Sequence, residues 1–302
     1  MKTVLLALPL LLGTPALAQI LPAPPTHAQG VAADTRHGAT FTDNGTIIFY
    51  QVTGSGTPLI LIHGYPLSGA LFQYQQVELA THFQVITLDL PGFGRSSAPS
   101  GFGSTTLYAH YVLDLMNHLG IERAIIGGHS MGGLITQEIY REAPQRFLGM
   151  ILIDTIAMAA SEIERGEWAG YGLQSYKGGV SSIINIVTPQ LLTGDTRHNN
   201  PTATTGIEDI IAEASVAGGV AGAETLAVRP NYTPYLSAIA VPVLVVEGLE
   251  DPVYGFPIAQ ALATQVPHGT LALLPNASHV SIYENPDLAN KAITTWASAN
   301  GF

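Results

Sequence analysis

The chain has 302 residues, of which 47% are hydrophobic and 11% are charged, so it is long enough to bury a large core and too apolar to be disordered. Asp and Glu number 22 against 11 Lys and Arg, and no basic cluster occurs, which argues against a nucleic-acid-binding surface. The absence of cysteine excludes thiol catalysis and thiolate metal sites, but it does not contradict export, because a chain of this length needs no disulfides.

The N-terminus has the pattern of a secretory signal peptide. Lys2 gives a positive start, residues 4–12 are apolar, and Ala16-Leu17-Ala18 matches an A-x-A cleavage site. The apolar run is too short to cross a bilayer as a lasting helix. We therefore expect residues 1–18 to be a signal peptide that directs the chain to the periplasm or outside the cell. Residues 19–38 are expected to form a Pro- and Ala-rich arm, and no later segment resembles a membrane span.

From residue 39 onward the patterns of strands and helices alternate. Asn44-Gly45 lies between two β-rich runs, 39–43 and 46–52, and this arrangement predicts an antiparallel hairpin. Later apolar runs predict buried strands at 58–62, 84–88, 124–126, 150–153, 243–246 and 271–274. Helical spacing predicts helices at 72–81, 108–119, from the residue after Ser130 to about 142, at 257–264 and from about 287. The alternation predicts an α/β fold with a mainly parallel sheet covered by helices on both faces.

One long interval, residues 157–237, contains no predicted buried strand. It has several helical stretches, Gly-rich joints at 178–179 and 218–219, and a polar run over 192–205 that predicts a loop. Because such an interval is too long to be one structureless loop, we expect an inserted helical cap over the edge of the sheet. The α/β core then comprises residues 39–156 and 238–302.

The segment Gly128-His129-Ser130-Met131-Gly132 fits the pattern G-x-S-x-G. A predicted strand precedes it and a predicted helix follows it. A serine on such a sharp turn needs a strained backbone and very small neighbours, and both flanking glycines meet that need. This context predicts that Ser130 is a catalytic nucleophile.

A nucleophilic serine needs a base and an acid that orients the base. His279 follows a predicted buried strand, so it should lie at the same edge of the sheet as Ser130. Among its competitors, two histidines lie in the arm, one in the polar run of the cap and two on a predicted helix: His27, His37, His198, His110 and His118. Asp251 follows the strand at 243–246, between serine and histidine in the chain. Asp154, at the end of another strand, is a rival for the acid, and Glu250 ranks third. The predicted triad is Ser130, His279 and Asp251.

Two backbone amides are predicted to stabilise the developing oxyanion. Met131 supplies one at the start of a helix, where the helix dipole favours negative charge. The turn His63-Gly64-Tyr65-Pro66 supplies the other through Tyr65, because Pro66 has no N–H. We expect His63 either to brace this turn or to face the substrate. The candidates for the substrate pocket are His63, Trp168, Tyr171 and Tyr176, although apolar residues of the cap often serve as the packing face of its helices.

The segments His63-Gly64-Tyr65-Pro66, Asp89-Leu90-Pro91-Gly92-Phe93-Gly94-Arg95-Ser96 and Gly128-His129-Ser130-Met131-Gly132-Gly133 occur with Asp251 and His279 in an order typical of α/β-hydrolases. Over residues 39–155 and 238–300 the chain resembles this superfamily. The resemblance implies the α/β-hydrolase fold and a structural role for Asp89. Haloalkane dehalogenases and epoxide hydrolases share the His-Gly-x-Pro turn but carry aspartate where this chain has Ser130. The chain therefore looks closer to cofactor-free haloperoxidases and small esterases.

The leading prediction is an exported serine hydrolase that cleaves a small or medium carboxylic ester through an acyl-enzyme. No metal or cofactor is expected, because H-E-x-x-H and a G-x-G-x-x-G fingerprint at a strand end do not occur. The expected partner is a small-molecule substrate. Lactone hydrolysis, perhydrolysis or haloperoxidation, aminopeptidase activity and carbon–carbon bond hydrolysis are alternatives on the same triad. An alternative of another class is a non-catalytic ligand-binding protein with this fold.

Overall fold

A computed structural model describes residues 19–20, 38–99 and 101–302. The predicted signal peptide and most of the predicted arm lie outside these residues. One sheet runs through the described chain in the order β1-β9-β8-β7-β6-β4-β5-β3-β2. Its strands are β1 (Gln19–Ile20), β2 (Ala39–Asp43), β3 (Thr46–Thr53), β4 (Thr57–Ile62), β5 (Phe83–Leu88), β6 (Ala124–His129), β7 (Phe147–Ile153), β8 (Val243–Gly248) and β9 (Gly269–Leu274). Only β2 with β3 and β3 with β5 pair antiparallel, so the mainly parallel α/β sheet is confirmed.

The predicted hairpin is present. Asn44 and Gly45 have φ angles of 45° and 84°, which are the left-handed values that a tight turn between right-twisted strands requires. Strand β1 pairs with β9 through Gln19 and Ile20, in a part of the chain where the sequence predicted only an arm.

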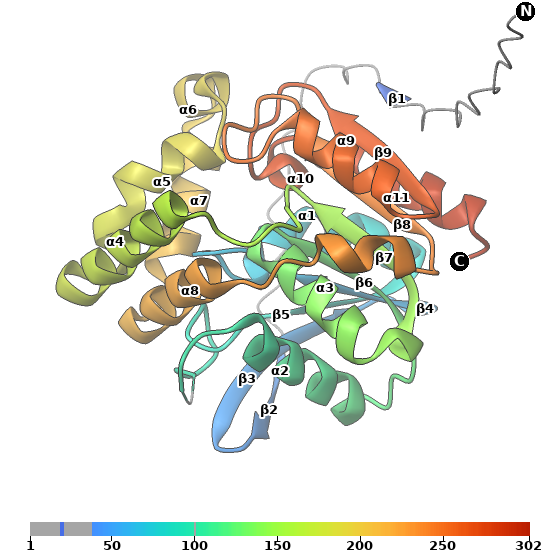
Figure 1. Ribbon diagram of the computed structural model, residues 1–302, viewed down its shortest axis with the longest axis horizontal. Helices are drawn as coiled ribbons and strands as arrows, with labels where there is room; N and C mark the ends of the chain where they lie inside the picture. Colours follow the sequence, from blue (N-terminus) through green and yellow to red (C-terminus); the bar gives the residue numbers. More distant parts are fainter. Residues whose placement is uncertain (1–18, 21–37, 100) are drawn as a thin grey trace, which may run out of the picture.

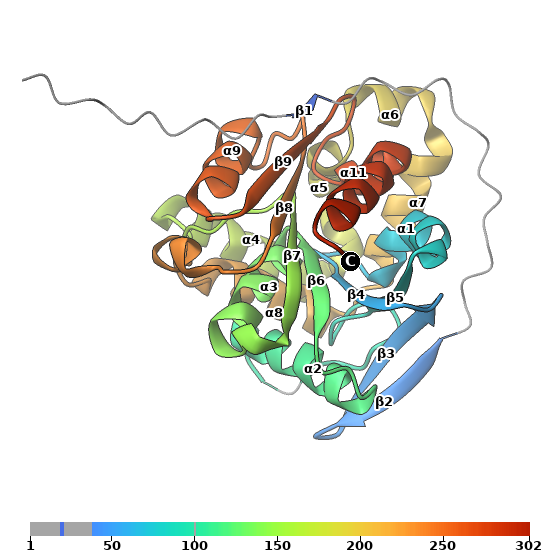
Figure 2. The same cartoon turned by 90° about the vertical axis from the view of Figure 1, so that its right-hand side faces the viewer.

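Helices cover both faces of the sheet, as the alternation predicted. Figure 2 shows α1 and α11 on one face and α2, α3 and α9 on the other. The helices of this part of the chain are η1 (Gly69–Phe72), α1 (Gln73–Glu78), η2 (Leu79–Thr81), α2 (Thr105–His118), α3 (Met131–Glu142), η3 (Pro144–Arg146), α9 (Phe256–Gln265), α10 (Ser281–Glu284) and α11 (Pro286–Ala299).

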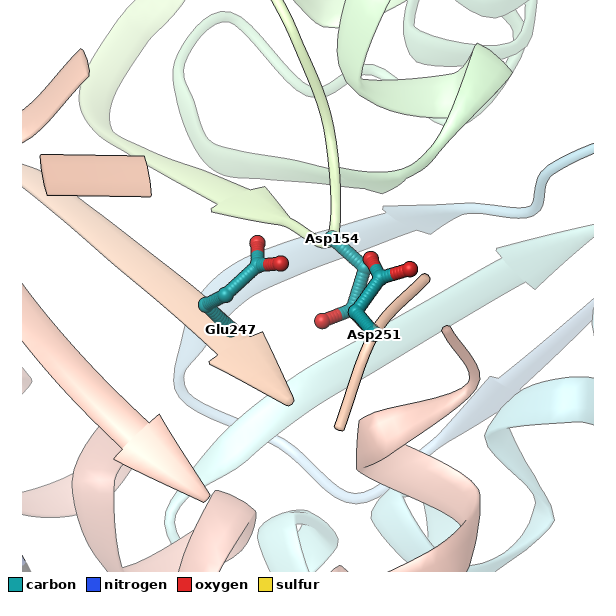
Figure 3. A group of neighbouring side chains, drawn as sticks. All are labelled: Asp154, Glu247 and Asp251. Atoms are coloured by element: carbon teal, nitrogen blue, oxygen red, sulfur yellow. The ribbon is translucent and has the colours of Figure 1, made fainter. Parts of the chain in front are cut away.

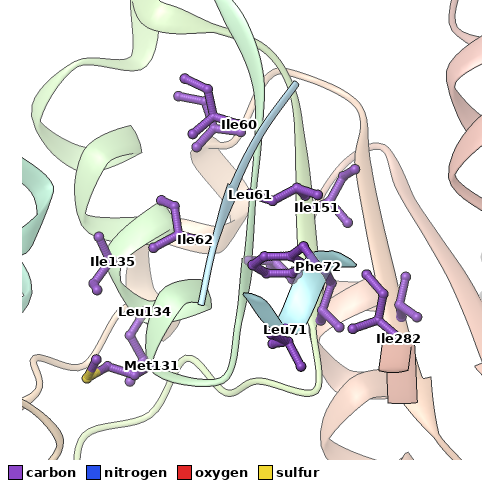
Figure 4. Packing of buried hydrophobic residues seen from close by; sticks show 14 of the residues in the cluster. Ile60, Leu61, Ile62, Leu71, Phe72, Met131, Leu134, Ile135, Ile151 and Ile282 are labelled. Atoms are coloured by element: carbon purple, nitrogen blue, oxygen red, sulfur yellow. The ribbon is translucent and has the colours of Figure 1, made fainter. Parts of the chain in front are cut away.

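Strand β4 is buried on both faces, which explains why its sequence is a continuous apolar run. Figure 4 shows Ile62 on the side of Leu134 and Ile135 of α3, while Leu61 lies on the opposite side with Phe72. Because successive side chains of a strand point to opposite faces, one short strand ties together both helical layers. This packing holds the turns at the carboxyl ends of the strands in fixed positions.

The interval between β7 and β8 is helical, and its helices gather on one side of the sheet in Figure 1. They are α4 (Glu162–Gly178), η4 (Val180–Ile183), α5 (Ile184–Leu191), α6 (Gly194–Asn199), α7 (Pro201–Ala212), α8 (Val216–Val228) and η5 (Thr233–Ala238). Among the described residues, no single helix is long and apolar enough to span a membrane, and α7 with α8 passes that test only as a pair bent by 95°.

Two predictions within this interval were wrong. The polar run at 192–205 forms α6 and the start of α7, because Thr193 and Asn200 cap the two helices with their side chains and Pro201 occupies a first-turn position. Gly218-Gly219 is not a joint but lies inside α8. A Cβ on Gly218 would lie 2.1 Å from the carbonyl oxygen of Gly92, so the glycine lets α8 approach the core backbone closely.

Candidate active site

Ser130 lies on a sharp turn between β6 and α3. Its φ of 52° and ψ of −114° are strained for a residue with a side chain, and the surrounding structure holds them. The Ser130 N–H donates to the Ile153 carbonyl at 2.9 Å, and Thr155 Oγ1 donates to the Ser130 carbonyl at 2.7 Å. A Cβ on Gly128 or on Gly132 would lie 2.1 Å from neighbouring backbone atoms, so both motif positions require glycine.

Ser130, His279 and Asp251 form one hydrogen-bonded chain. His279 Nε2 lies 2.9 Å from Ser130 Oγ, and His279 Nδ1 lies 2.8 Å from Asp251 Oδ2. Because a carboxylate only accepts hydrogen bonds, Nδ1 carries the ring proton and Nε2 is left to accept from the serine hydroxyl. Asp251 Oδ1 in turn accepts from the Val253 N–H at 2.6 Å. The arrangement is that of a base with the tautomer that removes a proton from the serine.

The electrostatic environment favours a charged pair behind Ser130. Burial alone would lower the pKa of His279, but the charge of Asp251 and the hydrogen bond to it, with the charge of Asp154, raise this pKa above its ordinary value. Burial would raise the pKa of Asp251, but the charge and the hydrogen bond of His279 and the Val253 amide lower it. Asp251 therefore stays ionised and stabilises imidazolium.

Neither rival acid forms a hydrogen bond with the imidazole of His279. Asp154 is buried at the end of β7, where Oδ1 accepts from the Gly248 N–H at 2.9 Å. Its Oδ2 accepts from the N–H and Oγ of Ser281, at 3.0 and 2.7 Å. Asp154 thus ties β7 to the segment that carries His279 rather than contacting the imidazole itself. Glu250 is exposed.

A further acidic side chain, Glu247, lies beside Asp154 and Asp251 and was not among the residues predicted from the sequence. Glu247 of β8 is fully buried, and oxygens of Asp154, Glu247 and Asp251 lie within 4.8 Å of one another (Figure 3). One feature of the sequence could have identified Glu247: it is an acidic residue inside the otherwise apolar run of β8, at a position where a parallel strand is buried on both faces.

The predicted oxyanion donors flank Ser130. Met131 is the first residue of α3, where a helix amide has no acceptor within its own helix. The turn from His63 to Pro66 passes directly beside Ser130, as shown by Gly64, on which a Cβ would lie 2.9 Å from Ser130 Cβ. The amides of Tyr65 and Met131 are therefore carried by two turns that meet at the serine.

His63 braces this turn and does not line the substrate cavity. Its Nδ1 donates to the Gly64 carbonyl at 2.9 Å, and its Nε2 accepts from the Leu90 N–H at 2.9 Å. Burial lowers the pKa of His63 to about 4, so the ring is neutral. Asp89 accepts from the N–H groups of Gly69 and Arg95, which agrees with a structural role.

A cavity of about 410 Å³, its open mouth included, lies above the triad. Of the four predicted pocket residues, Trp168 and Tyr171 line it, whereas Tyr176 is 71% exposed on the outer side of α4. The lining comprises Tyr65, Pro66, Ser130, Trp168, Tyr171, Val187, Gln190, Leu191, Leu226, Val253, Tyr254 and His279. Periodicity did not single out the residues of α5 and α8 in this set, because it does not tell which helix face turns toward the sheet.

Comparison with known proteins places the chain in a family. Residues 57–193 match the family model described as alpha/beta hydrolase fold. The 3-oxoadipate enol-lactonase 2 of Acinetobacter baylyi is 30% identical over 258 residues, covering 84% of this chain and 94% of that protein. The pimeloyl-[acyl-carrier protein] methyl ester esterase of Pectobacterium atrosepticum is 28% identical over 263 residues, or 83% of this chain and 99% of that protein.

The similarity extends to solved structures. A thermophilic esterase from Thermogutta terrifontis, with malate bound, superposes with a TM-score of 0.84 at 29% identity, covering 88% of this chain and all of that one. An enol-lactonase from Burkholderia xenovorans superposes with a TM-score of 0.81 at 25% identity, over 86% of this chain. The chain belongs to the α/β-hydrolase family.

Proposed function

We propose that this hydrolase cleaves small or medium carboxylic esters with Ser130 as nucleophile, His279 as general base and acid, and Asp251 as the residue that orients His279. The observation that carries the proposal is the continuous hydrogen-bonded chain from Asp251 through His279 to Ser130, at 2.8 and 2.9 Å, below an apolar cavity. The comparisons support the bond type, because enol-lactones and methyl esters are both carboxylic esters.

The first half of the reaction forms an acyl-enzyme. Ser130 Oγ attacks the ester carbonyl carbon while His279 Nε2 takes the hydroxyl proton. The carbonyl oxygen becomes an oxyanion, which accepts hydrogen bonds from the amides of Tyr65 and Met131. When the tetrahedral intermediate collapses, the carbon–oxygen bond to the alcohol breaks, and His279 donates the proton to the leaving alkoxide. The acyl group then remains on Ser130.

The second half repeats these steps with water. His279 Nε2 removes a proton from a water molecule as its oxygen attacks the acyl carbon, and the same two amides hold the oxyanion. Collapse breaks the bond to Ser130 Oγ, which takes back the proton from His279. The carboxylic acid leaves and the serine hydroxyl is restored.

The lining of the cavity favours an uncharged, apolar substrate. Aromatic and aliphatic side chains dominate it, and none of its described residues is Lys or Arg. A substrate carboxylate in this cavity would lose its hydration without gaining an ion pair, which is costly. We therefore expect neutral alkyl or aryl esters to be cleaved much faster than esters that carry a free carboxylate.

Lactone hydrolysis is the second candidate, favoured by the similarity to two enol-lactonases. The same steps apply, except that the leaving alkoxide stays attached to the acyl group. A small cavity with a buried nucleophile suits a compact ring as well as a short open ester.

The test combines labelling with turnover. A fluorophosphonate probe should label the wild-type chain and not Ser130→Ala, and hydrolysis of neutral p-nitrophenyl esters or of lactones should be lost in the same variant. Ser181→Ala, at an exposed serine of η4, is the matched control and should keep both signals. A non-catalytic ligand-binding protein would neither react with the probe nor turn over any ester or lactone, and that result would refute the proposal.

A further inference from the structure

Glu247 is a buried acid that the triad does not use. Its side chain is completely inaccessible to solvent, and neither of its oxygens receives a hydrogen bond of standard geometry from the described residues. No described Lys or Arg forms an ion pair with it. An ionised carboxylate in this position would have lost its hydration with only the backbone amide of Gly255 to stabilise it, which few proteins tolerate.

The neighbours of Glu247 make ionisation still less favourable. Asp154 faces it from the end of β7, and Asp251 faces it from the loop after β8 (Figure 3). Tyr254, from the same loop, is half-buried near these acids, and His279 lies beyond Asp251. Two carboxylates whose oxygens lie within 4.8 Å have only acceptors to offer each other. A proton on one of them turns this repulsion into an O–H···O hydrogen bond.

The proton belongs on Glu247 rather than on Asp251. Asp251 has the imidazole of His279 and the Val253 amide as donors, whereas Glu247 has no comparable partner. Burial and then the charges of Asp154 and Asp251 raise the pKa of Glu247 to about 11, while the pKa of Asp251 is lowered. The hydrogen bond between the two acids contributes to both shifts in these directions.

We propose that Glu247 is a positioning residue that remains protonated and donates its O–H to the carboxylate of Asp251. This inference rests on the proposed triad and adds a fourth member to it. The donated hydrogen bond holds Asp251 in the rotamer that meets His279 Nδ1. Because the acid is neutral, it adds no second negative charge that would trap His279 as imidazolium and remove the free base.

The test measures kcat, KM and the pH dependence of kcat/KM for hydrolysis of a neutral p-nitrophenyl ester by the full chain. Glu247→Gln keeps a neutral donor in the same place, and Glu247→Leu removes it at similar volume. We expect Glu247→Leu to lower kcat about tenfold with little change in KM, since a hydrogen bond to a charged group is lost. The acid-side midpoint of this variant should rise, because the carboxylate of Asp251 loses one donor and then interacts more strongly with His279. Glu247→Gln should restore kcat to within a few-fold and keep the wild-type midpoint.

Three results would overturn the proposal. If Glu247 were ionised, Glu247→Gln would remove a negative charge near His279 and move the midpoint to lower pH. If the three acids held a cation, a chelator would shift the wild-type midpoint. If Glu247→Leu matched the wild type in kcat and midpoint, the residue would have no positioning role.

Controls distinguish three outcomes: misfolding of a variant, failure of the proposed function and failure of the role of Glu247. Thermal unfolding and fluorophosphonate titration of active sites correct each kcat for misfolded protein. Glu138→Gln alters a carboxyl that is also fully buried but pairs with Arg141 and Thr106, and it should leave the midpoint unchanged. Infrared spectra need no turnover. Burial raises the pKa of Asp154 to about 8, so Asp154 also contributes a protonated carboxyl band at pH 7. The band of Glu247 is the one that remains when the spectrum of Glu247→Gln is subtracted from that of the wild type. A wild-type chain with this band but no Ser130-dependent activity would refute the proposed function alone, whereas absence of the band would refute the role of Glu247.

Discussion

The Nε2–H of His129 donates to the backbone carbonyl of His279 at 2.6 Å, so the residue before Ser130 holds the backbone of the proposed base. The His129 ring is fully buried, and burial followed by the proximity of His279 lowers its pKa to about 3. It is therefore a neutral donor at every pH at which the enzyme would work. Asp154 fixes the same segment through Ser281. The position of His279 thus depends on hydrogen bonds from β6 and β7 as well as on its own turn.

The His129 contact predicts a loss of turnover without a loss of binding. His129→Leu leaves the His279 carbonyl unpaired in the interior, so kcat should fall about 10- to 100-fold while KM changes little. The free energy of unfolding should fall by about 1–3 kcal/mol, measured by urea denaturation. The control is His110→Leu, at an exposed histidine of α2 that pairs with Glu142. Equal kcat values for His129→Leu and the wild type would show that the backbone of His279 needs no such support.

The raised pKa of His279 predicts where activity is lost on acidification. Only the unprotonated imidazole accepts the proton of Ser130, so kcat/KM should fall below the pKa of His279, with a midpoint above the 6.5 of an ordinary histidine. In Asp251→Asn the raising charge is gone, so the midpoint should move down. This variant should also lose about 10⁴-fold in kcat, because an amide no longer selects the required tautomer. A midpoint that is the same in both proteins would exclude His279 as the titrating base.

A buried proton on Glu247 should make the stability of the folded chain fall as the pH rises. Its pKa is raised in the folded state, so it contributes stability that is complete below 4.5 and is lost as the pH rises toward about 11. In this window each pH unit lowers the free energy of unfolding by about 1.4 kcal/mol, because Glu247 releases its proton when the chain unfolds. Glu247→Gln carries no such cost. Measured by urea denaturation, the free energy of unfolding of Glu247→Gln should equal that of the wild type near pH 4.5 and exceed it by roughly 3 kcal/mol at pH 7. A stability difference that does not vary with pH would contradict a buried proton on Glu247.

Two aromatic residues of α4 offer a matched test of the substrate cavity. The ring of Trp168 meets that of Tyr65 edge-on at 5.8 Å between centroids and lines the cavity, whereas Tyr176 is largely exposed on the same helix. Trp168→Ala should raise KM for a medium-chain ester about tenfold, since it removes an apolar wall. Tyr176→Ala should leave KM unchanged. Similar KM changes in both variants would indicate a general effect of α4 rather than contact with substrate.

Two helical glycines should respond to alanine in opposite directions. In α8, a Cβ on Gly218 would meet the backbone of Gly92 at 2.1 Å, so Gly218→Ala must separate α8 from the core at a cost of about 1–3 kcal/mol. In α4, a Cβ on Gly166 would meet nothing within 4 Å, and Gly166→Ala should stabilise by about 0.5–1 kcal/mol through helix propensity. Thermal unfolding of both variants checks this. A stable Gly218→Ala would mean that α8 does not approach Gly92 this closely.

Local patterns were sufficient to predict most of the framework. Asn44-Gly45 specified a hairpin through its own backbone preferences, and the apolar run of β4 indicated a strand buried on both faces. Patterns failed where capping decided the outcome: Thr193 and Asn200 each start a helix in a stretch whose polar composition suggested a loop. Capping depends on one side chain that meets one amide, which average polarity over a window does not capture.

The sequence by itself determined the elbow, because G-x-S-x-G between a strand and a helix encodes a local backbone strain that only glycine neighbours permit. It also determined that His279 and Asp251 follow strands, and parallel strands bring their carboxyl ends to one edge. Only the tertiary structure decided that Asp251 rather than Asp154 meets the imidazole, and that Glu247 lies behind it. Those outcomes depend on the lateral order of β7, β8 and β9, and on side-chain directions in a desolvated interior. Distances between residues far apart in the chain set the charge of each buried group there, and no local pattern contains them.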